Sequence, residues 1–173
     1  KGFDCLGFEP SKNVSELAQK KGLKIITDFF GPNLEEKNFK KQTNLICAAN
    51  VICHIPDLKN LIKGIDYFLS DDGIFVFEEP YLGSMFDKVS YDQIYDEHIY
   101  IFSISSIKKI FNEMDFELFR AKPQITHGGS MRYYIRRKQK NINNLQIDEV
   151  EKKLGIDTLE ACLKFKKNCE FSK

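Results

Sequence analysis

Short apolar runs alternate with amphipathic stretches along the first half of the chain. Residues 3–8 and 23–30 are typical of strands, and Asn13 and Glu16 between them have the spacing of a helix capping box. Residues 44–51 are apolar almost throughout. Such continuous burial is typical of a central parallel strand that helices cover on both faces.

The alternation continues, because a helix is expected after Asp57 and a strand over 74–77. This βαβαβαβ order predicts an α/β protein with a Rossmann-like, mostly parallel sheet and helices on both faces. After a long loop over 78–103, a helix starting at Ser105 and Ser106 precedes two closing antiparallel strands, over 117–122 and 130–136. A linker over 140–144 and a helix over about 148–171 follow. We therefore expect a core over residues 1–139 and the beginning of a second, C-terminal unit over 140–173.

Composition and charge narrow the functional class. The 26 Lys and Arg residues nearly balance the 25 Asp and Glu residues, which disfavours nucleic-acid binding, and no apolar run is long enough for a membrane span. The five cysteines form no C-x-x-C pair, and no two histidines have metal-ligand spacing on a helix. We expect reduced thiols, a cytoplasmic location and no metal site within this chain.

Three polar residues follow the first three predicted strands: Glu9, Asp28 and Asn50. The carboxyl ends of parallel strands are where such sheets bind ligands, and a carboxylate can accept both hydroxyl hydrogens of a ribose. Asp28 could accept from an adenine amino group, with Phe29 or Phe30 against the ring. The alternative is that the two acids are helix caps or solvated loop residues. No G-x-G-x-x-G loop is present.

All three histidines, His54, His98 and His127, fall in predicted loops. The segment containing Tyr95, Glu97 and His98 combines an imidazole suited to proton abstraction, a phenol that can donate to developing negative charge, and a carboxylate that can orient either group. The alternatives are structural histidines and a polar surface loop, although the aromatic residues of this loop favour a pocket wall.

Several blocks of sequence, in order, resemble the S-adenosylmethionine-dependent sugar C-methyltransferases, which methylate C-3 of nucleotide-linked keto-deoxysugars. The resemblance runs from about Gly2 to Arg136. The blocks that carry it are GFEPSKNV (7–14), DFF (28–30), ANVICHIPD (49–57), GIFVFEEPY (73–81), YDEHIYIFS (95–103) and HGGSMR (127–132).

The resemblance implies S-adenosylmethionine as cofactor, a nucleotide-sugar substrate, a monomer or weak homo-oligomer, and a zinc ion only in an N-terminal domain outside this chain. It also implies that the first strand and its glycine-rich loop precede Lys1. Residue by residue, it assigns cofactor binding, catalysis and substrate binding as follows. The cofactor residues are Glu9 (ribose), Asp28 and Phe29 (adenine) and Asn50; the catalytic residues are His98 (general base), Tyr95, Glu97 and His54; the substrate residues are His127, Gly128 and Tyr81.

Two other functional classes stay open at this point. One is an O- or N-methyltransferase that acts on another small molecule. The other is a non-catalytic Rossmann-like remnant that has lost its cofactor loop. A nicotinamide oxidoreductase is disfavoured, because the fourth residue after Tyr95 is Ile99 rather than lysine.

Overall fold

A computed structural model describes residues 2–31, 43–139 and 149–172. The strands are β1 (Gly7–Phe8), β2 (Ile25–Ile26), β3 (Thr43–Ala49), β4 (Leu69–Pro80), β5 (Phe116–Gln124) and β6 (Ser130–Arg137). The α-helices are α1 (Lys12–Lys20), α2 (Leu58–Phe68), α3 (Leu82–Lys88), α4 (Ile104–Asn112), α5 (Glu149–Leu154) and α6 (Leu159–Phe171). Short 3-10 helices are η2 (Ile52–His54), η3 (Tyr91–Gln93) and η4 (Thr126–Gly128).

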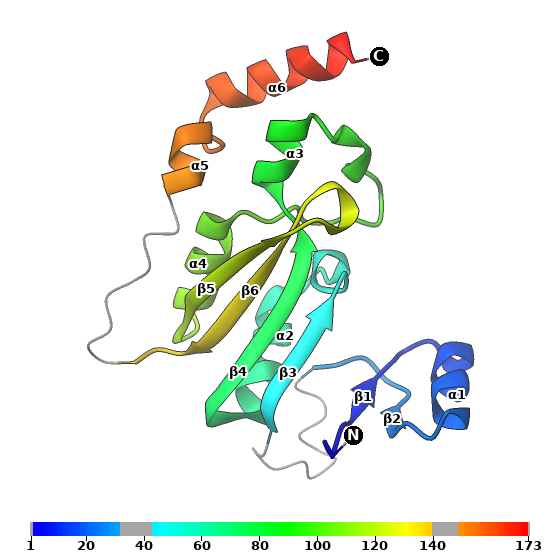
Figure 1. Cartoon of the computed structure of the whole chain (residues 1–173). Coiled ribbons are helices and arrows are strands. Elements are labelled where there is room, and N and C mark those ends of the chain that lie inside the picture. The colour runs from blue at the N-terminus through cyan, green and yellow to red at the C-terminus, as the bar shows by residue number, and fades with distance from the viewer. Residues whose placement is uncertain (1, 32–42, 140–148, 173) are drawn as a thin grey trace.

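The strands form two sheets (Figure 1). β1 and β2 make a parallel pair, and the larger sheet has the order β3-β4-β6-β5. Only β3 and β4 are parallel in the larger sheet, since β6 runs antiparallel to both β4 and β5. The α/β class is confirmed, but this sheet is mixed rather than mostly parallel.

The helices of the core begin where side chains satisfy their first N–H groups. The Asp57 carboxylate accepts a hydrogen bond from the N–H of Asn60 (3.0 Å) at the start of α2. Ser103 and Ser106 form a reciprocal capping box at α4, so this helix begins slightly before the expected Ser105. The buried faces of both helices pack with β4 and β6 in one core, which includes Ile62, Ile65, Phe75, Phe77, Ile107, Phe111, Tyr133 and Ile135.

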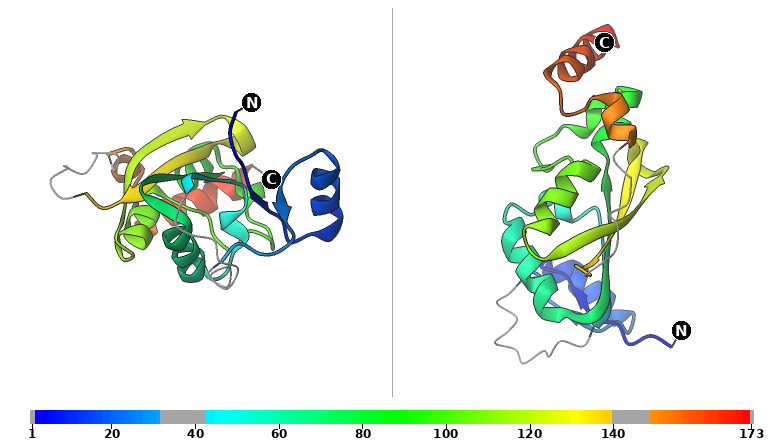
Figure 2. Two further views of the ribbon diagram at one scale, coloured as in Figure 1. Left: turned by 90° about the horizontal axis from the view of Figure 1, so that it is seen from below. Right: turned by 90° about the vertical axis from the view of Figure 1, so that its left-hand side faces the viewer.

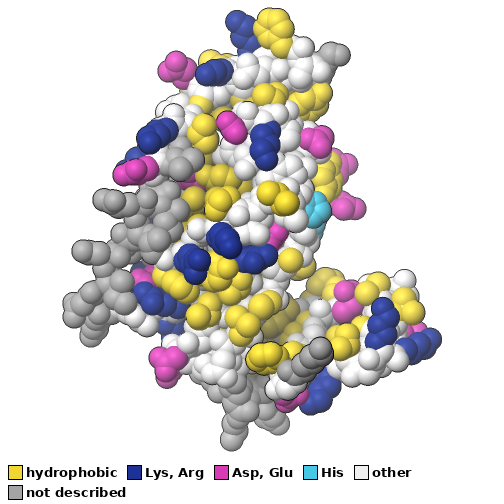
Figure 3. All heavy atoms as spheres, viewed as in Figure 1, with side chains coloured by type: hydrophobic (Ala, Val, Ile, Leu, Met, Phe, Trp, Pro, Cys, Tyr) yellow, Lys and Arg dark blue, Asp and Glu magenta, His cyan; other side chains and the backbone are white. Residues whose placement is uncertain are grey.

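The expectation of helices on both faces of the sheet is wrong for the described residues. In Figure 2, α2 and α4 lie on the same face of the larger sheet. β3 is an edge strand, with Leu45 54% exposed and Cys47 exposed. Figure 3 shows hydrophobic side chains and Lys or Arg side chains at the surface of the opposite face. Apolar composition alone could not distinguish a central strand from an edge strand.

Three local predictions also differ from the structure. The loop expected over 78–103 contains the end of β4 and the helix α3. Ser11, not Asn13, is the N-cap residue of α1, and its side chain makes no capping hydrogen bond. The single helix expected over about 148–171 is two helices, α5 and α6, separated by a turn at Gly155. The helix proposed over 34–41 and the linker over 140–144 lie outside the described residues.

The C-terminal helices are tied to the core through α5. Glu151 is 4% exposed, and its two carboxylate oxygens accept hydrogen bonds from the N–H groups of Ile104 (2.5 Å) and Ser105 (3.0 Å). This carboxylate therefore satisfies the N-terminus of α4 from a distant part of the sequence. In the described part of the chain, no helix has the length and apolar character that crossing a membrane requires.

Candidate active site

The carboxyl ends of β3 and β4 form the base of the site. The strands are parallel and in register, with Ala49 opposite Glu78, so the residues that follow them emerge at the same edge of the sheet. The N–H of Asn50 donates to the carbonyl oxygen of Glu78 (2.9 Å) and extends this pairing by one residue. The segment that carries His54 therefore leaves the sheet beside the end of β4.

A buried carboxylate fixes the turn between β3 and η2. Glu79 is 0% exposed, and its Oε1 accepts hydrogen bonds from the N–H groups of Val51 (3.0 Å) and Ile52 (2.7 Å). These N–H groups follow the end of β3 and have no carbonyl partner on a neighbouring strand in the described part of the chain, so the carboxylate takes the place of that acceptor. Glu79 thereby fixes the backbone just before Cys53 and His54.

The main chain then holds the 91–103 loop against η2. The carbonyl oxygen of Cys53 accepts from the N–H groups of Ile99 (3.0 Å) and Tyr100 (3.2 Å). Nδ1 of His54 lies 2.6 Å from the carbonyl oxygen of Glu97, and since a carbonyl only accepts, this nitrogen carries the proton. Two segments more than forty residues apart in sequence are thus joined at three points.

His98 sits in this loop with both ring nitrogens engaged. Nδ1 lies 2.8 Å from the carbonyl oxygen of Gln93, so it is the donor, and Nε2 lies 2.8 Å from the Tyr95 hydroxyl. In the neutral ring, Nε2 therefore holds a lone pair that accepts the phenol hydrogen. The ring centroid of His98 is 4.1 Å from that of Tyr95 and 5.1 Å from that of His54. The structure brings together three of the four expected catalytic side chains.

The fourth, Glu97, takes part differently. Its side chain is exposed, and its main-chain carbonyl, rather than its carboxylate, contacts His54. A hydrogen bond or ion pair of the Glu97 carboxylate is not found in the described part of the chain.

A second polar cluster lies where η4 meets the end of β3. Nδ2 of Asn50 is 3.1 Å from Nε2 of His127, and both residues have positive φ values, 52° and 49°. Positive φ is uncommon for residues other than glycine, and it costs free energy that neighbouring contacts must offset. Oδ1 of Asn50 is buried and has no hydrogen-bond partner in the described residues.

Beside this pair, Glu78 links β4 to β6 and η4. Its carboxylate accepts from the Thr126 hydroxyl (2.6 Å) and from two nitrogens of Arg132 (2.8 and 3.0 Å). The Thr126 hydrogen bond, and then Arg132 and His127, lower the pKa of Glu78. The carboxylate is therefore kept ionised below the usual range for glutamate, next to the cluster of Asn50 and His127.

The expected cofactor acids stand at the ends of the two short strands. The N–H of Glu9 donates to the carbonyl oxygen of Ile26 (3.1 Å), so both acids leave the same edge of the small sheet. Oε1 of Glu9 accepts from the N–H of Ser11, and Oδ1 of Asp28 accepts from the N–H of Phe29, both at 2.8 Å. Each acid thus has a local turn role, as the alternative interpretation supposed. Phe29 is 76% exposed, whereas Phe30 packs against other rings.

The remaining substrate candidates are placed at different depths. The Gly128 carbonyl oxygen accepts a hydrogen bond from Nζ of Lys88 (2.7 Å), and the φ angle of Gly128 is +73°. Tyr81 is 6% exposed with its hydroxyl buried, and burial, followed by the nearby Glu151 carboxylate, raises the pKa of that phenol. The structure puts the side chain of Tyr81 inside the core, while its main-chain N–H donates to the carbonyl oxygen of Gly129 (3.2 Å), next to Gly128.

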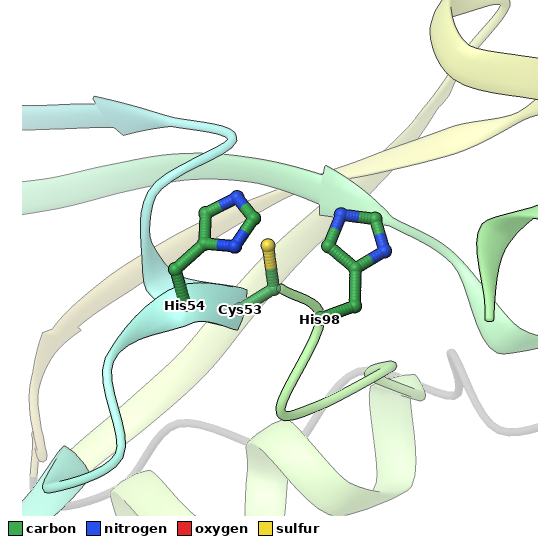
Figure 4. Close-up of side chains that lie close together, drawn as sticks. All are labelled: Cys53, His54 and His98. Carbon is green, nitrogen blue, oxygen red and sulfur yellow. The ribbon is translucent and has the colours of Figure 1, made fainter. Parts of the chain in front are cut away.

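Cys53 and Glu79 are the site residues that sequence reasoning missed. The thiol of Cys53 lies between the rings of His54 and His98 (Figure 4), and one ligand atom from each of the three residues lies within 4.8 Å of the others. Burial, and then Glu79, raise the pKa of the Cys53 thiol well above its usual value. The adjacency of Cys53 and His54 in sequence was a visible signal, but the proximity of His98 was not.

The chain has the α/β Rossmann-like fold of methyltransferases. Solved structures that share the fold include the magnesium protoporphyrin IX methyltransferase ChlM from Synechocystis PCC 6803, solved with bound SAH (TM-score 0.55, 15% identity, 77% of this chain and 64% of that one). Another is a SAM-dependent methyltransferase from Thermotoga maritima (TM-score 0.57, 17% identity, 74% and 71% coverage).

The sequence is more specific about the family. Residues 1–121 match the model of a methyltransferase-domain family, and the chain belongs to that family. The expectation of a methyltransferase is confirmed at the level of this domain family. The chain is also 27% identical over 132 residues to the C-methyltransferase NovU of Streptomyces niveus. That match covers 75% of this chain but spans only 31% of the relative's length.

Proposed function

We propose that the chain forms the cofactor-binding and catalytic core of a C-methyltransferase. Its substrate would be a nucleotide-linked deoxysugar, methylated on the ring carbon next to the ketone. The observation that carries the proposal is the hydrogen-bonded pair of Tyr95 and His98 beside His54, at the carboxyl edge of a methyltransferase-family sheet. The similarity to C-methyltransferase NovU supports carbon as the acceptor.

The residues at the strand ends fit S-adenosylmethionine. Glu9 would hold the ribose, Asp28 and the exposed ring of Phe29 the adenine, and Asn50 the methionine portion. The buried Oδ1 of Asn50, which has no hydrogen-bond partner among the residues that the structure describes, is an acceptor that a ligand donor would satisfy. When bound, S-adenosylmethionine supplies an electrophilic methyl group.

His98 has the arrangement of a general base. Its Nδ1 donates a proton to the Gln93 carbonyl in a hydrogen bond. Nε2, which carries the lone pair, is therefore the atom that can take a proton from the carbon next to the ketone. As that proton moves to Nε2, the Tyr95 hydroxyl loses its acceptor there and can donate to the oxygen of the developing enolate. The hydrogen bond between Tyr95 and His98 is thus replaced in the transition state by two interactions with the substrate: Nε2 of His98 takes the carbon-bound proton, and the Tyr95 hydroxyl donates to the enolate oxygen.

The other residues position the substrate and the base. His54 is fixed through its Nδ1 proton by the Glu97 carbonyl, which leaves its Nε2 lone pair as an acceptor for a sugar hydroxyl. The exposed Glu97 carboxylate would orient or neutralise charge within this cluster. His127 and Gly128 would contact the substrate from the η4 side, where the main chain has positive φ. Tyr81, whose side chain is buried in the core, would support this part of the site without contacting the substrate.

The role of the base is tested by paired substitutions in the 91–103 loop. We expect His98→Asn to abolish methyl transfer, and Tyr95→Phe to lower kcat with little change in KM, because its bond strengthens only in the transition state. Tyr100→Phe is the matched control, since that hydroxyl donates to the Pro56 carbonyl rather than to His98. Undiminished turnover of the His98 variant would remove it from this role.

The cofactor and the reaction class need separate measurements. Calorimetry with S-adenosylhomocysteine should show binding that Glu9→Ala weakens and that Glu16→Ala, at an exposed position on α1, leaves unchanged. A folded chain that binds none would favour the non-catalytic remnant. In deuterated water, carbon methylation predicts exchange at the acidic carbon, which O- or N-methylation does not require.

A further inference from the structure

Cys53, His54 and His98 form a cluster that the proposed methyl transfer does not fully use. One ligand atom from each lies within 4.8 Å of the others, and Figure 4 shows the sulfur between the two imidazole rings. Cys53 and His54 come from η2, whereas His98 comes from the loop that follows η3. A thiol and two imidazoles are the ligand types that zinc prefers, and they are poor ligands for calcium or magnesium.

The geometry needs only a small adjustment for a tetrahedral ion. With zinc–sulfur bonds of about 2.3 Å and zinc–nitrogen bonds of about 2.0–2.1 Å, ligand atoms around one ion lie roughly 3.5 Å apart. The three ligand atoms lie within 4.8 Å of one another, so they must approach by about 1 Å, and rotation of the half-buried rings of His54 and His98 supplies this shift. The backbone is already tied at this point by the two hydrogen bonds to the Cys53 carbonyl.

The histidines also have outer partners of the kind that metal-bound imidazoles use. The Gln93 carbonyl accepts from Nδ1 of His98, which orients the ring and presents Nε2. The Glu97 carbonyl restrains the His54 ring in the same way. The current partner of His98 Nε2 is the hydroxyl of Tyr95, a residue that is 46% exposed and can turn toward solvent.

A buried charge beside the thiol favours a cation. Glu79 is 0% exposed; its Oε1 is used by two N–H groups, and its Oε2 has no hydrogen-bond partner in the described residues. Glu79 lies close enough to interact with the Cys53 thiol. A divalent ion bound to the Cys53 thiolate would make the charge of ion, thiolate and carboxylate sum to zero, which relieves the cost of an uncompensated buried carboxylate.

We propose that Cys53, His54 and His98 together bind one zinc ion, with a water molecule as the fourth ligand. Binding replaces the thiol proton, which is released to solvent, and no oxidation or reduction occurs. The effect on activity rests on the proposed function: the ion takes the Nε2 lone pair of His98, so zinc and the general-base role exclude each other. Zinc would therefore inhibit methyl transfer reversibly.

Cobalt(II) is the probe for this site, because its spectrum reports both thiolate ligation and tetrahedral geometry. The reduced, metal-free chain is titrated with cobalt, and zinc is then added to displace it. We expect one equivalent of cobalt with a thiolate charge-transfer band. Cys53→Ser should abolish the band, and His54→Gln should weaken cobalt binding by more than the roughly 10- to 100-fold that loss of an outer partner costs.

Cys47→Ser is the matched control, since Cys47 is an exposed thiol on β3 outside the cluster, and it should leave the band and the activity unchanged. Because Cys53 is buried, circular dichroism must show that its variant is folded; the His54 variant, at a half-buried position, tests the site independently. A thiolate band that persists in folded Cys53→Ser, or affinity unchanged in His54→Gln, would overturn the proposal.

The two proposals fail separately. A chain that binds one cobalt ion through Cys53 but transfers no methyl group when it is metal-free supports the zinc site and contradicts the proposed function. A chain that transfers methyl groups but shows no thiolate–cobalt band overturns the zinc site alone. Inhibition by zinc that a chelator reverses, and that Cys53→Ser escapes, supports the competition at His98.

Discussion

The buried carboxylate of Glu79 offers the sharpest test of how the site is held. Replacing it with alanine leaves the N–H groups of Val51 and Ile52 without their acceptor inside the protein. An unsatisfied buried polar group costs about 1–3 kcal/mol, which applies in full to the buried N–H of Ile52. The N–H of Val51 is only partly buried and adds less. Since whole domains are stable by only about 5–15 kcal/mol, this change should be large.

Glu79→Gln separates hydrogen bonding from charge. Its amide oxygen can still accept from both N–H groups, so the loss per bond is only the difference between a charged and a neutral acceptor, about 1 kcal/mol. A neutral amide is also less costly to bury than a carboxylate, which offsets part of that loss. We therefore expect the free energy of unfolding to decrease in the order wild type, Glu79→Gln, Glu79→Ala.

Urea unfolding followed by circular dichroism measures this order, and thermal unfolding should show a drop of about 2–4 °C for each kcal/mol in a chain of this size. Glu16→Ala, at an exposed position on α1, should change stability by less than about 0.5 kcal/mol. Equal losses in the two Glu79 variants, or a loss below about 1 kcal/mol in Glu79→Ala, would refute the argument from its hydrogen bonds.

Two further predictions concern the neighbouring η4 region. Gly129→Ala should lower the free energy of unfolding in urea by about 1–3 kcal/mol, because φ is +129° and the new Cβ would lie 2.5 Å from the Ser84 side chain; Gly22→Ala, with positive φ but open space, should cost less. The lowered pKa of Glu78 stabilises the fold above the unfolded value of about 4.3, and this contribution is lost as pH falls through the lowered pKa. The stability difference between wild type and Glu78→Gln should therefore be full near neutral pH and disappear in acid; a pH-independent difference would contradict the link to ionisation.

The candidate site was predictable where residues act through neighbours in sequence. Tyr95 and His98 are three residues apart, and their hydrogen bond joins two residues that the sequence had already grouped. The place of His54 followed from its position after a predicted strand. Glu97 shows the limit of this reasoning, because its carbonyl rather than its side chain makes the contact, and side-chain chemistry does not report on the main chain.

Contacts between distant segments could not be predicted in the same way. Glu79 falls in the segment that was expected as a loop over 78–103, yet it lies in β4 and is buried, where its carboxylate is the acceptor for the turn after β3. Tyr81 belongs to a matching sequence block but lies in the core, beside Glu151 from α5. In both cases the environment of a polar group is set by elements that are remote in sequence.

The sequence by itself determined the α/β class, much of the order of strands and helices, and membership of the methyltransferase-domain family, because hydrophobic periodicity and local motifs are carried by residues close together in the chain. Only the tertiary structure decided that the larger sheet is mixed, that β3 is an edge strand, and that Cys53 stands between His54 and His98. Strand order and side-chain clusters depend on which distant segments pair and pack, and a local pattern of apolar and polar residues does not specify that choice.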